Sequence, residues 1–333
     1  MEPQSSLAIM YKKFFNLQAN PFNPNPDPRF LYLTPAMQEA LAGLAYGIKQ
    51  RKGFLLLTGE VGTGKTTLLN RLLEWLQEER VATAFIFNSR LTEGEFFDFL
   101  MADFGIPCES REKSHVLMKL NEWLLERYRE GGTTVLIVDE AQNLSAQVLE
   151  EIRLLTNMET TSEKLLQIVL SGQPELEEKI RDVHLRQLRQ RITIRCKTFP
   201  LSREEMQAYI AERLRIAGCN GTPVFSLEAV EAVYRHSQGI PRIANLLCEH
   251  ALINAFVDQV RPVPAAIVEG VANEFELQKA DLVAKQGASG GNGDNSELVM
   301  EAVIRNLQLL LEEMARKNAA KREPHDSDVT PNS

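Results

Sequence analysis

The stretch "FLLLTGEVGTGKTTLLNRLLEWL", residues 54–76, constrains the fold of this chain more than any other part of the sequence. Residues suited to a buried strand run into a glycine-rich turn, and the turn opens a long apolar helix. The turn fits the pattern G-x-x-x-x-G-K-[ST] without departure. Its glycines let successive backbone N–H groups point at phosphate oxygens, where a side chain would block close approach. The sequence therefore predicts a phosphate-binding loop between a strand and a helix.

Two side chains of this loop have chemistry that suits a nucleotide. Lys65 can reach the β- and γ-phosphates as a compact charge, and the Thr66 hydroxyl can bind Mg²⁺. The positive N-terminal end of the following helix adds to the site. We therefore predict that the loop binds the nucleotide through Gly59, Glu60, Val61, Gly62, Thr63, Gly64, Lys65, Thr66 and Thr67.

A pair of acidic residues follows a second buried strand, in "TTVLIVDEAQNL", residues 133–144. Four apolar residues place Asp139 and Glu140 at the carboxyl end of that strand, and ligands of open α/β sheets bind outside this edge. We predict that Asp139 holds Mg²⁺ through its water shell and that Glu140 polarises the attacking water as general base. Either acid could instead cap the next helix, a task that Asn143 or Ser145 can also perform.

The apolar pattern between residues 36 and 200 alternates short strands with helical segments of ten or more residues. The strands are apolar or β-branched and nearly continuous, as in parallel sheets buried on both faces. We predict an α/β domain with a five-stranded parallel sheet over residues 36–200, built from βαβ units. The predicted strands are Phe54–Thr58, Ala82–Phe87, Thr134–Val138, Leu166–Ser171 and Ile192–Cys196.

The flanking segments have different compositions. Residues 1–35 form a proline- and aromatic-rich arm, for which we predict extended, irregular structure. Residues 201–281 show helical patterns only, which predicts a small all-helical domain of four helices, the last from about Pro264 to Lys279. Its first helix follows Ser202, which with Glu205 makes a capping box.

Three further segments are predicted beyond this domain. Residues 282–297 are rich in Gly, Ser and Asn and indicate a flexible linker. Residues 298–318 predict an amphipathic helix of about two heptads, which either docks on its own protein or binds a partner or a second copy. We expect residues 319–333 to be disordered.

Composition limits the class of protein. The formal net charge of −8 argues against a dedicated nucleic-acid binder, although residues 181–215 carry nine Lys or Arg against four Asp or Glu. The four cysteines lie far apart and give no spacing for zinc or a disulfide framework. The sequence shows no secretory signal pattern and no apolar run near the ~20 residues that span a bilayer. We predict a cytoplasmic protein without a membrane span.

The segments "GEVGTGKTT", "VLIVDEAQNL", "LLQIVLSGQPEL" and "GIPRIANLLCEHAL" together resemble the AAA+ ATPases. They are most similar to the branch of the general-secretion-pathway protein A (ExeA) type, and the arm "FFNLQANPFNPNPDPRFLYLTPAMQEALAGLAYGI" resembles the arm of that branch. The resemblance covers roughly residues 11–280. It implies a P-loop NTPase fold followed by a helical lid, ATP and Mg²⁺ as cofactors, and ATP hydrolysis as the activity.

The resemblance also assigns residues that sense the nucleotide. A polar residue at the end of the fourth strand senses the γ-phosphate in such ATPases, and here Gln173 is the candidate, with Ser171 as the alternative. Arg242 in the G-x-P-R segment would report the nucleotide to the lid. Asn88 at the end of the second strand would restrain the catalytic glutamate, although a plain Asx-turn also explains it.

An arginine finger implies assembly. The family supplies an arginine at the subunit edge to the neighbour's nucleotide, and here Arg191 is the candidate, with Arg189 and Arg186 as alternatives. Such a finger can be worth 10³–10⁵ in rate, on the order seen in phosphoryl transfer. A site of this kind implies self-association into a ring or filament, for which we expect a hexamer.

These expectations combine into one predicted function and two alternatives. The resemblance implies a Mg²⁺-dependent oligomeric ATPase that serves cell-envelope assembly, in secretion, pilus formation or exopolysaccharide export. Members of this type commonly continue into a transmembrane helix and a peptidoglycan-binding domain, which this sequence lacks. We therefore expect an envelope or secretion-system protein to recruit it to the inner membrane. The alternatives are an ATP-dependent DNA-binding regulator of the transposition-ATPase type, favoured by the basic stretch 181–215, and a nucleotide-gated scaffold that barely hydrolyses ATP.

Overall fold

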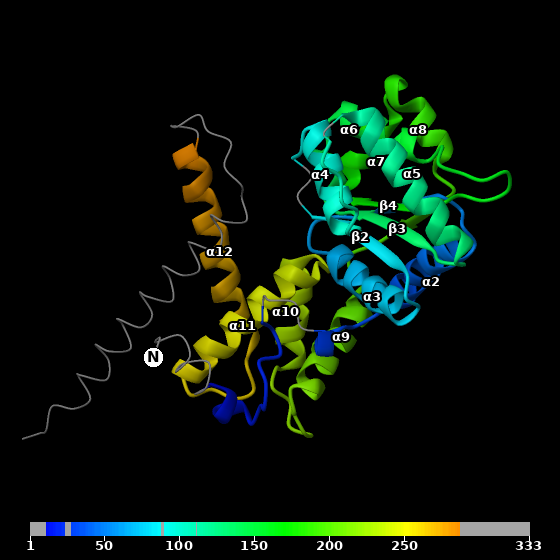
Figure 1. Ribbon diagram of the computed structural model, residues 1–333. Coiled ribbons are helices and arrows are strands. Elements are labelled where there is room, and N and C mark those ends of the chain that lie inside the picture. The colour runs from blue at the N-terminus through cyan, green and yellow to red at the C-terminus, as the bar shows by residue number, and fades with distance from the viewer. Residues whose placement is uncertain (1–10, 24–27, 88–89, 111, 287–333) are drawn as a thin grey trace, which may run out of the picture.

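The computed structural model describes residues 11–23, 28–87, 90–110 and 112–286. These residues form an α/β unit and a helical unit that lie side by side, and the chain passes from the first to the second after the last strand of the sheet (Figure 1). The predicted helix at 298–318 and the predicted tail at 319–333 lie outside the described residues.

The α/β unit contains one five-stranded parallel sheet with the order β2-β3-β4-β1-β5. This confirms the predicted five-stranded parallel sheet. The strands are β1 (Phe54–Thr58), β2 (Ala82–Ile86), β3 (Thr134–Val138), β4 (Leu166–Gly172) and β5 (Ile194–Lys197).

Strand boundaries differ from the prediction mainly at β5. The prediction began this strand at Ile192, but the preceding helix continues to Arg191 and pairing with β1 starts at Ile194, which lies opposite Leu55. β2 ends one residue earlier than predicted, because Phe87 leaves the sheet and is 71% exposed.

Helices cover both faces of this sheet, which explains why the three central strands, β1, β3 and β4, are buried at every position. Leu55 and Leu57 of β1 face one layer, and Phe54 and Leu56 face the other. The first layer is formed by α2 (Pro35–Lys49) and α3 (Lys65–Glu78). The opposite layer contains α4 (Glu93–Asp103), α5 (Lys113–Arg129), α6 (Ala146–Leu155), α7 (Pro174–Arg181) and α8 (Arg186–Arg191) (Figure 1). The short 3₁₀ helices among the described residues are η1 (Pro28–Phe30), η2 (Ala141–Asn143) and η3 (Val183–Leu185).

The helical unit consists of α9 (Arg203–Ile216), α10 (Leu227–Ser237), α11 (Pro241–Val257) and α12 (Ala265–Gln286). The predicted capping box is present, because the Ser202 side chain accepts from Glu205 N and the Glu205 side chain accepts from Ser202 N. The last helix runs to Gln286, so residues 282–286, predicted as the start of a linker, are helical. These residues contain no glycine or proline that would end a helix.

The N-terminal arm differs most from its prediction. Residues 11–15 are helical, and the aromatic side chains of Tyr11, Phe15 and Phe22 are completely buried in the core of the helical unit. Gln18 N donates to Ala217 O at the end of α9 at 2.7 Å. The arm is therefore a structural part of the helical unit, although it precedes the first helix of that unit by about 190 residues in the sequence.

Within the described residues, every helix is too short or too polar to cross a lipid bilayer.

Candidate nucleotide-binding site

The predicted phosphate loop connects β1 to α3 and packs directly on the residue that follows β5. A methyl group on Gly59 would collide with Thr198 Oγ1 and would lie 2.7 Å from Thr198 O. Thr63 Oγ1 lies 2.8 Å from Thr198 Oγ1 and donates to Glu60 O at 2.7 Å. These contacts hold the loop in a compact turn above the carboxyl end of β1.

Lys65 is buried at the start of α3, and its side chain folds back under the loop. The ammonium Nζ donates to Gly59 O at 2.8 Å and to Glu60 O at 3.0 Å. Burial lowers the pKa of the Lys65 ammonium, and the negative charges of Glu140 and Asp139 oppose this shift. A cation thus lies in the loop with two carboxylates facing it.

Asp139 is the centre of the site. Its Oδ2 accepts from Thr66 Oγ1 at 3.0 Å, and its Oδ1 accepts from Ser171 Oγ at 2.8 Å and from Glu140 N at 3.0 Å. These residues come from the start of α3, the end of β3 and the end of β4. Carboxylate and hydroxyl oxygens are the ligands that Mg²⁺ prefers, so Thr66 and Asp139 fit the predicted metal role.

Glu140 follows Asp139 with a left-handed backbone, φ 51°. Its Oε2 accepts from Gln173 Nε2 at 3.1 Å and also from Gln142 Nε2. The structure therefore places both candidates for the γ-phosphate sensor in the site, with Ser171 on Asp139 and Gln173 on Glu140. Sequence reasoning missed Gln142, whose only signal is a polar residue two positions after the acidic pair.

The helical unit reaches the loop through the start of α11. Arg242 N donates to Gly62 O at 3.3 Å, and a methyl group on Gly62 would lie 2.9 Å from side-chain atoms of both Arg242 and Ile240. Gly62 has φ 79°, so two independent constraints favour glycine here. Arg242 therefore lies beside the loop, and its role in reporting the nucleotide to the lid stays a prediction.

Arg191 lies far from the loop of its own chain. It ends α8, and its Nη2 donates to Asn157 Oδ1 at 2.9 Å. The next residues run along the start of β1, where Thr193 N donates to Phe54 O at 2.9 Å. Arg191 thus lies near the amino ends of the parallel strands, whereas the loop lies at their carboxyl ends. Arg186 and Arg189 are exposed on the same helix, and Asn88 lies outside the described residues.

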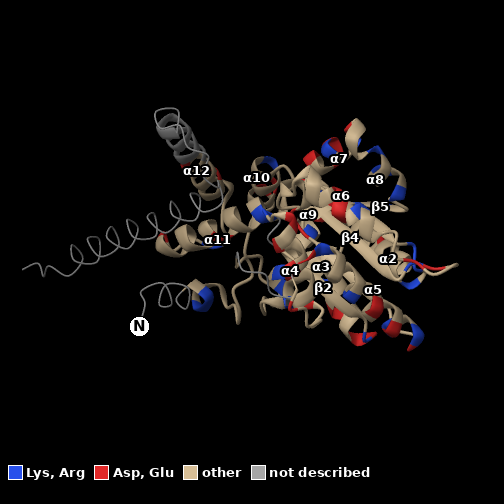
Figure 2. Ribbon diagram, turned by 45° about the horizontal axis from the view of Figure 1, so that its top comes forward, with Lys and Arg blue, Asp and Glu red and all other residues tan. Residues whose placement is uncertain are grey.

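The basic stretch 181–215 does not form one surface. Arg213 is buried under the rings of Phe22, Phe30 and Tyr209. Four others form ion pairs: Arg181 and Lys197 with Glu177, Arg203 with Glu231, and Arg215 with Glu212. Blue and red segments interleave over the helices in Figure 2. The structure thus gives no added support to the DNA-binding interpretation.

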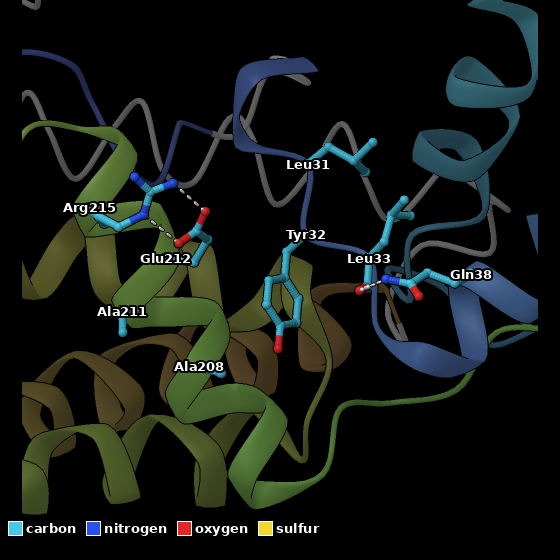
Figure 3. Close-up of a pocket in the computed structure, with 8 residues that line it drawn as sticks. All are labelled: Leu31, Tyr32, Leu33, Gln38, Ala208, Ala211, Glu212 and Arg215. Atoms are coloured by element: carbon cyan, nitrogen blue, oxygen red, sulfur yellow. Dashed lines mark hydrogen bonds and ion pairs between the residues drawn. The ribbon is translucent and has the colours of Figure 1, made fainter. Parts of the chain in front are cut away.

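A groove of about 550 Å³ lies at the junction of the two units (Figure 3). The arm supplies one wall, with Tyr32 edge-on to Tyr209 at a centroid distance of 5.8 Å. The lining residues are Leu31, Tyr32, Leu33 and Gln38 from the arm and α2, and Ala208, Ala211, Glu212 and Arg215 from α9. None of them belongs to the phosphate loop, so this groove is separate from the site described above.

Comparison with known proteins gives a family match over the residues that form the phosphate loop and the acidic pair. Residues 48–180 match the family described as an AAA domain. The chain is also 43% identical over 287 residues to general secretion pathway protein A of Aeromonas hydrophila, with 84% of this chain and 52% of that protein covered. The chain thus spans about half the length of this curated relative. The match confirms the resemblance to the ExeA type.

Solved structures share the fold of this chain at low sequence identity. Drosophila ORC, in a structure bound to DNA, superposes with a TM-score of 0.58 at 20% identity, covering 98% of this chain and 88% of that chain. Cdc6p of Pyrobaculum aerophilum gives a TM-score of 0.56 at 18% identity, with 72% and 68% covered. These likenesses confirm the predicted AAA+ fold.

Proposed function

We propose that this protein is an oligomeric, Mg²⁺-dependent ATPase that couples ATP binding and hydrolysis to cell-envelope assembly in secretion, pilus formation or exopolysaccharide export. The observation that carries the proposal is the convergence of the Thr66 and Ser171 hydroxyls on Asp139, with Glu140 beside them. The name of the Aeromonas hydrophila relative, general secretion pathway protein A, supports secretion as the process.

The proposed chemistry divides the work among the residues of the site. Backbone N–H groups of the loop and the Lys65 ammonium bind the phosphates, and Thr66 and Asp139 hold Mg²⁺. The metal, when bound, neutralises charge that develops on the phosphate oxygens. Glu140 accepts the proton of the attacking water, and Gln173 links the state of the γ-phosphate to Glu140. Arg242 links the loop to the helical lid.

Assembly follows from the position of the proposed finger. Arg191 lies near the amino ends of the strands and the phosphate loop lies at their carboxyl ends, so a single chain cannot bring them together. We infer that Arg191 acts on the nucleotide of a neighbour, with Arg189 and Arg186 as the other candidates. This arrangement requires a ring or filament, and a hexamer is the expected state. We further propose that the protein acts in the cytoplasm and that an envelope or secretion-system protein recruits it to the inner membrane.

Loss of single site residues tests the ATPase proposal. Lys65→Ala should weaken ATP binding and abolish turnover, because the buried ammonium is the main positive charge in the loop. Glu140→Gln should still bind ATP but lose turnover by about 10² or more, as expected for a general base. The measurement is phosphate release with Mg²⁺ and with EDTA, together with binding of a fluorescent ATP analogue.

Glu122→Gln is the matched control for the charge change. Glu122 is an exposed carboxylate on α5 that pairs with Lys119, and its replacement should leave turnover unchanged. A wild-type protein that binds ATP tightly and releases no phosphate at any protein concentration would instead support the nucleotide-gated scaffold.

Capture of partners tests the envelope part of the proposal. Glu140→Gln with ATP should hold the assembled state, so envelope or secretion-system components should be enriched on it relative to Lys65→Ala. Equal recovery of such components on both variants would contradict nucleotide-dependent recruitment.

A further inference from the structure

Gln142 has both ends of its side-chain amide bonded to residues of the nucleotide site. It lies in η2, and its Oε1 accepts from Gln173 N at 3.1 Å, while its Nε2 donates to Glu140 Oε2. A backbone N–H can only donate and a carboxylate can only accept. The two neighbours therefore fix which way the amide faces.

A second amide reaches the same oxygen. Gln173 Nε2 donates to Glu140 Oε2 at 3.1 Å, so one carboxylate oxygen receives two N–H donors from residues 31 positions apart in the chain. Hydrogen bonds to an ionised acceptor are roughly twice as strong as neutral ones. The pair forms an amide clamp, by which we mean Gln142 and Gln173 acting together on Glu140.

The surrounding backbone is shaped for this clamp. A methyl group on Gly172 would lie 2.8 Å from Gln142 Oε1, so glycine at the end of β4 leaves the space that the amide occupies. From α7, Lys179 Nζ donates to Gln142 O at 3.0 Å and also to Leu144 O. These contacts fix η2 against the end of β4.

We propose that Gln142 is a positioning residue for Glu140, holding the carboxylate in one orientation jointly with Gln173. The proposal rests on the ATPase function proposed above. A partly exposed glutamate has several rotamers, and selecting one of them during the reaction costs conformational entropy. Fixing that orientation in advance places the base where it can take the proton of the attacking water. Gln142 acts through Glu140 and has no contact of its own with the phosphate loop in the structure described.

Gln142→Glu is the sharpest variant. It keeps the size of the side chain and the oxygen that accepts from Gln173 N, but it replaces the donor to Glu140 with a second carboxylate that repels it. We expect kcat to fall about tenfold or more, the effect of losing one charge-assisted hydrogen bond in the transition state. The KM for ATP should stay within about twofold, because the loop and Lys65 are untouched.

Gln142→Ala should give the same split between kcat and KM, and Gln147→Ala serves as the matched control. Gln147 is exposed on α6, so its loss should change neither constant. If the bond from Gln142 to Glu140 does not position the base, Gln142→Ala will keep the wild-type kcat, and the proposal is overturned. An increase in KM with kcat unchanged would overturn it as well.

A crystal structure of Gln142→Ala separates this proposal from the ATPase proposal. The clamp predicts that the Glu140 carboxylate leaves Gln173 or occupies several rotamers. A carboxylate that keeps its place and its bond to Gln173 would refute the positioning role. If wild-type protein fails to hydrolyse ATP, the function proposed above fails, and this structure still decides whether Gln142 positions Glu140.

Discussion

At the residue scale, one missing methyl group lets the phosphate loop lie on the chain after β5. Gly59 sits against the Thr198 side chain and its backbone carbonyl. A hydroxyl can rotate away from an added Cβ, but a carbonyl can move only with its backbone. The loop therefore depends on Gly59 for its packing as much as for its approach to phosphate.

We predict that Gly59→Ala lowers both ATP affinity and the melting temperature. The backbone of the loop or of Thr198 must shift, because the added carbon would lie 2.7 Å from Thr198 O. Overpacking of this kind costs about 1–3 kcal/mol, so we expect a drop of several degrees in thermal denaturation. ATP affinity, measured with a fluorescent analogue, should fall at least about tenfold.

Gly94→Ala is the control for this change. Gly94 lies in α4, and an added Cβ would meet no atom within 4 Å, so alanine there should leave ATP binding unchanged and stabilise the helix slightly. If Gly59→Ala binds ATP like the wild type, the contact with Thr198 is not a constraint on the loop.

Sequence reasoning was most successful for residues whose chemistry follows from a local pattern. Lys65 and Thr66 belong to the loop motif, and Asp139 and Glu140 follow a buried strand; the structure brings these four together. Gln142 could not be predicted in the same way. Its bonds depend on Gly172 at the end of β4 and on Gln173 N directly after it, which meet Gln142 only after the sheet has formed.

At the element scale, side chains of the arm donate hydrogen bonds to the largely buried carboxylate of Glu249 on α11. Glu249 accepts from Tyr11 Oη at 3.0 Å and from Asn20 Nδ2 at 2.9 Å. Burial raises the pKa of Glu249, while these two hydrogen bonds and the charges of Lys12 and Arg213 oppose the increase. The folded protein therefore binds a proton at Glu249 more readily than the unfolded chain does.

We predict that Glu249→Gln raises the melting temperature at about pH 8 and that the gain shrinks as pH falls toward about 5. Because the pKa of Glu249 is higher in the folded state, ionisation above the unfolded pKa costs stability, and protonation restores it. Glutamine is uncharged at every pH and keeps an oxygen that can accept from Tyr11 and Asn20. Thermal denaturation of both proteins over this pH range is the measurement. A loss of stability in Glu249→Gln that is largest at high pH would show that the arm binds the charged carboxylate specifically.

Secondary structure that follows from a local apolar pattern could be predicted from the sequence. Packing against residues distant in the chain could not. The five strands were predicted because each is a short apolar run between helices. The burial of Tyr11, Phe15 and Phe22 was not, because proline spacing indicates irregular structure and says nothing about what covers the aromatic rings. The prediction also ended α12 too early, although residues 282–286 contain no glycine or proline that stops a helix.

At the scale of the whole molecule, the proposed active site is divided between two copies. Arg191→Ala should bind ATP like the wild type and lose turnover, on the order of 10³ or more if the finger acts as in other phosphoryl-transfer enzymes. Mixing Arg191→Ala with Lys65→Ala should restore turnover above that of either variant alone. The first variant supplies an intact nucleotide site and the second supplies the finger. The measurement is phosphate release against the mixing ratio.

The opposite result is equally informative. Normal turnover by Arg191→Ala alone would transfer the finger role to Arg189 or Arg186, which are exposed on the same helix. Turnover that stays proportional to protein concentration at every dilution, with no gain on mixing, would contradict a shared site. Sequence could predict that a neighbour is needed, but ring size depends on how surfaces of two copies fit, and no local pattern encodes that fit.

The burial of the arm in the helical unit also sets an order of events during synthesis. Tyr11 contacts Glu249, 238 residues later in the chain. At ~5–20 residues per second, the arm leaves the ribosome roughly 10–50 s before the last part of its core exists. During that interval its aromatic rings are exposed to solvent beside a sheet that can already fold. The nascent chain is therefore most open to chaperones and to misassembly at the arm, which is made early but can pack only after Glu249 has been synthesised.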